Sequence, residues 1–158
     1  MTGSAAYASL QETFRRGALV GDALGILGWD QATIMPEGSA DGRAEQIATL
    51  SVMRHELVVN PEVSDGIARA KQDFATQDTG DWDRGNLREM ERAYALAAAL
   101  PGDLVEAAAR ANAVCELQWR GARAENDYAS LLPTLREVLN LVRQTADARA
   151  EALSLAPY

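Results

Sequence analysis

Residues 4–28 have the sequence SAAYASLQETFRRGALVGDALGILG, and this segment predicts a long amphipathic helix. Its first apolar residues recur at the three- and four-residue spacing of one helical face: Tyr7, Leu10 and Phe14. Three glycines continue that face at one-turn spacing: Gly17, Gly21 and Gly25. Because each interior glycine costs a helix about 1 kcal/mol relative to alanine, we interpret these glycines as the place where another helix crosses at close range.

The chain after Gly38 repeats the helical pattern. Each further helix is expected to begin at or beside a residue that favours a helix N-terminus: Ser39, Asn60, Asp81, Pro101 and Ser130. The third helix then turns Val63, Ile67, Ala70 and Phe74 inward, and the last one Leu135, Val138, Val142, Ala146 and Leu153. The sequence contains no run of alternating β-branched residues that would indicate a strand. The expected fold class is all-α, with about six helices in a bundle or helical-hairpin array and no sheet.

Length, charge and composition restrict the kind of protein. The 158 residues suffice for one domain. A net charge of −8 repels phosphate backbones, so we expect no nucleic-acid partner. The most apolar early segment, residues 17–29, is shorter than the roughly 20 residues that cross a bilayer and contains Asp22, so we expect no membrane partner. One cysteine and no recognisable signal peptide favour a cytoplasmic location.

The sequence offers no catalytic residue and no metal ligand. A zinc helix of the His-Glu-x-x-His type needs two histidines one turn apart, whereas this chain has one histidine, His55, with Val59 at the second position. We interpret His55 as a surface or capping residue near the end of its helix. Cys115 shares an apolar stripe with Trp119, which is typical of a small core residue rather than a nucleophile.

Several segments carry a family resemblance. Residues 29–36, WDQATIMP, are followed by RAEQIATL at 43–50 and by His55. This order resembles the amino-terminal signature of the carboxypeptidase Taq family: a Trp-Asp-Gln-x-Thr-x-Met-Pro loop, a helix with Arg-Ala-x-Gln-x-x-x-Leu, and a nearby His. Residues 86–94, the Leu-Pro pair at 100–101 and residues 119–128 resemble later parts of the family pattern, which usually has Phe where Tyr128 stands.

The resemblance implies a place in a larger enzyme. Family members release carboxy-terminal residues from peptide substrates, and two His and a Glu hold zinc or another divalent metal. Those ligands lie in a part of the family's proteins beyond the region that this chain matches. We therefore expect residues 1–158 to be the amino-terminal helical region that covers the substrate groove, binding no metal and inactive alone. The alternative is a free-standing helical binding or regulatory module without catalysis.

The segment after the first helix, residues 29–38, is expected to be a loop because of its Pro and Gly. The resemblance makes four of its residues candidates for facing substrate: Trp29, Asp30, Gln31 and Met35. The competing interpretation, which we favour, is structural. Trp29, Ile34 and Met35 would then fill the helix junction, while Asp30 and Gln31 would bond to helix ends.

Adjacent apolar residues in the last helix widen its apolar surface beyond one stripe. They occur as three pairs: Leu131 with Leu132, Val138 with Leu139, and Leu141 with Val142. We expect this face to be buried on two sides in a longer protein. The isolated chain would then form a homo-oligomer through this face or bind a hydrophobic dye there.

Overall fold

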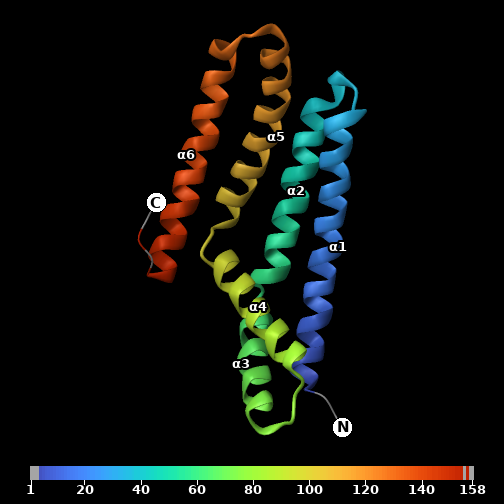
Figure 1. The fold of residues 1–158 in the computed structure, drawn as a ribbon, viewed down its shortest axis with the longest axis vertical. Helices are drawn as coiled ribbons and strands as arrows, with labels where there is room; N and C mark the ends of the chain where they lie inside the picture. The colour runs from blue at the N-terminus through green and yellow to red at the C-terminus, as the bar shows by residue number, and fades with distance from the viewer. Residues whose placement is uncertain (1–3, 155, 157–158) are drawn as a thin grey trace.

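The computed structural model describes residues 4–154 and 156, and all regular structure there is helical (Figure 1). Its elements are α1 (Ala5–Thr33), the 3-10 turn η1 (Glu37–Ser39), α2 (Ala40–Val59), α3 (Pro61–Thr76), α4 (Asp81–Ala98), α5 (Gly102–Glu125) and α6 (Tyr128–Leu153). Asn60 alone separates α2 from α3, and joining these two gives five helices where the sequence predicts about six. The all-α class without strands is confirmed for the described residues.

The long helices form an open layer. Figure 1 shows α1, α2, α5 and α6 side by side in that order, with neighbours running in opposite directions. Helix α2 packs against both α1 and α5, and α6 packs against α5. Helices α3 and α4 lie together at the end of the layer where α1 begins (Figure 1). Helices α1 and α6 are therefore the two edges of the layer.

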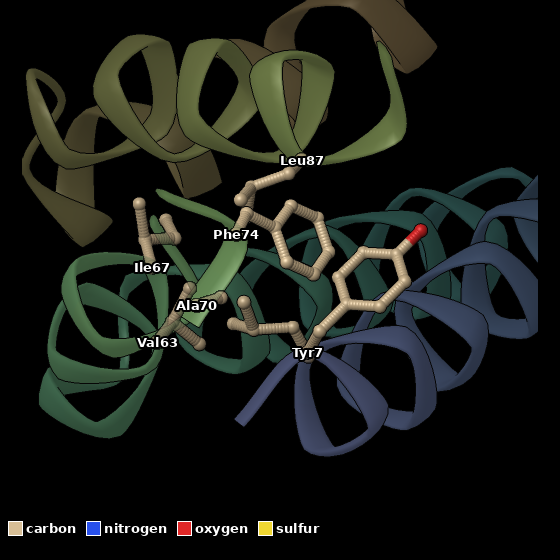
Figure 2. Packing of buried hydrophobic residues seen from close by; sticks show 7 residues of the cluster. Tyr7, Val63, Ile67, Ala70, Phe74 and Leu87 are labelled. Carbon is tan, nitrogen blue, oxygen red and sulfur yellow. The ribbon is translucent and has the colours of Figure 1, made fainter. Parts of the chain in front are cut away.

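The main apolar cluster lies where α1, α3 and α4 meet (Figure 2). The four residues expected to face inward from the third helix are all buried in it, which confirms that stripe: Val63, Ile67, Ala70 and Phe74. Figure 2 shows Tyr7 beside Phe74, with ring centroids 5.0 Å apart in an edge-to-face arrangement. Leu10 of α1 and Leu87 of α4 complete the cluster.

Hydrogen bonds fix the beginning of α1 to the same two helices. Ser4 caps α1 by accepting a hydrogen bond from the Tyr7 amide at 3.1 Å, and its hydroxyl donates to Asp73 of α3 at 2.6 Å. The Tyr7 hydroxyl donates to Asp83 of α4 at 3.1 Å. The cap of α1 thus also sets the position of this helix on its partners.

Several helix boundaries differ from the sequence-based expectation. Helix α1 does not end at Gly28 but continues to Thr33, because the first residue that breaks a helix is Pro36. Helix α6 begins at Tyr128 rather than Ser130, since Asp127 accepts a hydrogen bond from the Ser130 amide at 3.1 Å. The cap position of α4 is Gly80 rather than Asp81. The Asn60 cap of α3 is confirmed, because its side chain accepts from the Glu62 amide.

The glycine face of α1 crosses α2 at ordinary distances, so our interpretation of a close crossing there is wrong. A Cβ atom on Gly17 would lie 4.0 Å from Val58, one on Gly21 would lie 3.5 Å from Arg54, and Gly25 faces open space. The close approach occurs instead at Gly66 of α3. A Cβ atom there would lie 3.0 Å from Cδ2 of the buried Leu10.

The expected inward stripes of the last two helices are wrong in part. Leu135 and Val142 of α6 are exposed, whereas Leu131, Leu141 and Ala150 are buried. In α5, Trp119 is exposed and Cys115 half-buried, whereas Ala113 is buried; Ala122, which belongs to the same expected stripe, is buried as predicted. Because α6 is an edge helix, only the narrow face against α5 is covered.

We predict that Gly66→Val destabilises the protein by about 1–3 kcal/mol relative to Gly25→Val, because the new side chain overpacks against Leu10. Both substitutions make the same change in helix propensity, so their difference reports packing. Urea unfolding followed by circular dichroism measures it. Equal unfolding free energies for the two variants would show that Leu10 moves aside freely.

Candidate functional site

Three of the four candidate groove residues lie in the last part of α1, and the fourth follows it. Trp29, Asp30 and Gln31 are helical, and α1 ends as the amides of Ile34 and Met35 both donate to the Asp30 carbonyl, at 3.1 and 3.0 Å. The expected loop is therefore restricted to the residues after Thr33. A helical backbone sends these neighbouring side chains in different directions.

Gln31 is buried and joins α1 to α5. The residue is 4% exposed, and its Nε2 donates to Oε2 of Glu116 at 2.8 Å and to the Ala113 carbonyl at 3.3 Å. Arg120 donates to the Gln31 backbone carbonyl at 3.0 Å and forms an ion pair with Glu116. These contacts form a closed set of bonds, which we call the Gln31–Glu116–Arg120 ring.

Asp30 joins α1 to α2. Its carboxylate pairs with Nη2 of Arg43 at 2.6 Å, and the Arg43 side chain is only 13% exposed. Arg43 also donates through Nη1 to the Leu27 carbonyl at 2.7 Å and through Nε to Gln46 at 3.1 Å. Three of the guanidinium's nitrogens are thus engaged, and the pair fixes the start of α2 on the end of α1.

Trp29 points away from these contacts. Its side chain is 61% exposed, that of Ile34 is 70% exposed, and that of Met35 is half-buried. The interpretation that Trp29 and Ile34 fill the helix junction is therefore wrong. Asp30 and Gln31 do make interhelical bonds: Asp30 pairs with Arg43 in the first turn of α2, as expected for a bond to a helix end, whereas Gln31 bonds to groups within α5. Of the four candidates, Trp29 is the one most available to contact another molecule.

Among the described residues, no three His, Cys, Asp or Glu side chains gather closely enough to hold a metal ion. His55 is half-buried and lines an open pocket, and its imidazole makes no side-chain hydrogen bond to the end of α2 within residues 4–154. In the same part of the chain, no helix is long and apolar enough to cross a membrane.

The sequence interpretation assigned no role to Glu116 or Arg120. Their spacing of four residues on α5 does signal an ion pair. Gln31, however, is separated from them by more than 80 positions in the sequence. No local pattern could therefore have joined the three.

Comparison with known proteins shows one consistent relationship. The family model for carboxypeptidase Taq (M32) metallopeptidases matches residues 9–158. Thermostable carboxypeptidase 1 of Thermus thermophilus is 31% identical over 147 residues, which are 93% of this chain and 29% of that protein. The protein of the same name from Pyrococcus furiosus is 27% identical over 134 residues, covering 85% of this chain and 26% of the relative.

Solved structures share the fold of this chain. Metallocarboxypeptidase 1 of Trypanosoma cruzi is 32% identical and superposes with a TM-score of 0.69, over 92% of this chain and 28% of that one. The crystal structure of BsuCP has a TM-score of 0.87 at 16% identity, over 95% of this chain and 31% of that one, which shows the shared fold. The chain therefore spans less than a third of the length of the relatives that it matches.

We predict that Arg43→Met lowers the free energy of unfolding by about 1.5–3 kcal/mol, because it leaves the partly buried Asp30 carboxylate without its charged partner. Arg92→Met is the matched control, since Arg92 forms an exposed pair with Glu89 on one helix and should cost under about 1 kcal/mol. Thermal and urea unfolding compare the two. Similar losses would mean that the Asp30–Arg43 pair does not fix the helices.

Proposed function

Because this chain belongs to the carboxypeptidase Taq family of metallopeptidases, we propose that it is the amino-terminal helical part of a zinc-dependent carboxypeptidase that releases carboxy-terminal residues from peptides. The match to the family model over residues 9–158 carries this proposal. The relatives' greater length supports the view that this region works together with a second, catalytic part.

The metal would belong to that second part. The chain has one histidine, and its described residues contain no group of metal-ligating side chains, so they do not fit a resident zinc or other divalent ion. The alternative, a free-standing helical binding module, is also consistent with the lack of a metal-ligating cluster in the described residues. The two proposals differ in whether the protein hydrolyses peptides.

The role proposed for this chain is to cover the substrate groove. The Gln31–Glu116–Arg120 ring and the Asp30–Arg43 pair hold the end of α1 against two other helices. Trp29 projects from this fixed end with most of its ring exposed. An indole held in this way can contact apolar side chains of a peptide at a small entropic cost, because its supporting backbone is already ordered.

The outer face of α6 supports the view that another part packs on this region. Leu135, Leu139 and Val142 follow one another at helical spacing and are 38%, 46% and 53% exposed. Monomeric proteins rarely leave large contiguous apolar patches open to water. In the proposed enzyme the catalytic part would cover this stripe, whereas in a free-standing module a second copy would have to do so.

We predict that the 158-residue chain alone retains no stoichiometric zinc after dialysis and releases no amino acid from a blocked dipeptide. The longer protein encoded in the same reading frame should release the carboxy-terminal residue, and a chelator should abolish this. Elemental analysis and an amino-acid release assay measure both. One zinc per isolated chain, or an inactive longer protein without a His-Glu-x-x-His segment, would contradict the proposal.

We further predict that Trp29→Ala in the longer protein raises KM for apolar peptides by about three- to tenfold, with an unchanged melting temperature, because the lost contact is with substrate. Trp82→Ala is the control, since Trp82 on α4 is the same residue type and is even more exposed, at 86% against 61% for Trp29. An unchanged KM, or equal effects of both substitutions, would contradict the proposal that Trp29 contacts substrate in the groove.

A further inference from the structure

Residues from α1, α2, α4, α5 and α6 line an open pocket of about 440 Å³. Much of its wall is apolar and includes Leu24, Val58 and Leu104. Its polar lining includes Arg54 and His55 from α2 and Arg149 from α6. The volume lies within the roughly 300–1,000 Å³ that is usual for small-molecule sites.

The charge of this lining is opposite to that of the chain. Acidic residues outnumber basic ones by 23 to 15 in the sequence, yet no Asp or Glu lines the pocket. Within residues 4–154, neither Arg54 nor Arg149 forms an ion pair. The one hydrogen bond that Arg149 donates, from Nε to the Leu96 carbonyl at 3.4 Å, leaves its two terminal nitrogens for another acceptor.

The two arginines reach the pocket from different helices, Arg54 from α2 and Arg149 from α6. The Arg54 side chain lies across α1 at Gly21, where its Nε atom is 3.5 Å from the position that a Cβ atom would take. Arg149 is anchored towards the end of α4 through Leu96. Both arginines line the pocket beside an apolar wall that a hydrocarbon group can cover.

We propose that this pocket binds a small carboxylate that carries an apolar tail, with the carboxylate between Arg54 and Arg149 and the tail against Leu24, Val58 and Leu104. Guanidinium groups match carboxylates in charge and geometry. A free amino acid is a poorer ligand, because its ammonium group would meet cationic side chains and no acid in the lining. This site is independent of the proposed peptidase function.

Octanoate is a suitable probe, and His55 is a built-in reporter. Because the chain has one histidine, its imidazole proton signals are unambiguous in an NMR spectrum. Octanoate should shift them along a saturable curve. The neutral 1-octanol and the cationic octylammonium have the same tail and should bind at least about tenfold more weakly, because they lack the charge-assisted bonds. Equal affinities for octanoate and octanol, or no saturable shift with octanoate, would overturn the proposal.

The matched variants are the double substitution Arg54→Gln with Arg149→Gln, and Arg143→Gln as control. Arg143 is exposed on the same helix as Arg149 and does not line the pocket. Calorimetric titration with octanoate should give a dissociation constant raised at least about tenfold by the double substitution and unchanged by Arg143→Gln. If the double variant loses helicity, Arg54→Gln alone provides the test, since Arg54 is an exposed residue. Equal affinity in Arg54→Gln and in Arg143→Gln would contradict the site.

Discussion

The Gln31–Glu116–Arg120 ring spans two helices that are not neighbours in the layer. Helix α2 lies between α1 and α5, so contacts between adjacent helices alone would let the outer ones pivot about it. The ring connects α1 directly to α5 at one end, while the cluster around Leu10 and Phe74 holds the other end of α1. Only Gln31 is buried in this ring, whereas the side chains of Arg120 and Glu116 are 33% and 42% exposed, so the largest cost of losing a partner falls on the Gln31 amide.

Local sequence patterns were sufficient wherever one short segment determined the structure. The Asn60–Pro61 boundary combines a side-chain cap with a residue that needs no hydrogen-bond donor in the first turn, and both act within three residues. The stripe of α3 was likewise identifiable, because this helix packs on α1 and α4 along a single face. The predicted end of α1 at Gly28 is wrong because that prediction assigned Trp29 to the same loop as Pro36 and Gly38. No residue before Pro36 stops a helix, and α1 continues to Thr33.

Features that depend on a distant partner could not be predicted. Gly66 resembles any other helical glycine in the sequence, and its role follows from Leu10, more than 50 positions away, lying directly over it. The inward face of α6 depends on which side α5 occupies, and an edge helix with many apolar residues offers more than one candidate face. For the same reason Gln31 gave no local sign that it would be buried against Glu116.

The family signature in this chain mainly encodes architecture. Asp30, Gln31 and Arg43 are all engaged in bonds between helices, so a match to this segment identifies the layer and where its helices join. It carries no information about the metal, which explains how family membership can be evident in a chain without a candidate ligand set in its described residues. Trp29 differs from these neighbours, because its side chain is mostly exposed where they are tied to other helices. The exposed indole contributes little to the packing of this chain, in contrast to the interhelical bonds of Asp30 and Gln31.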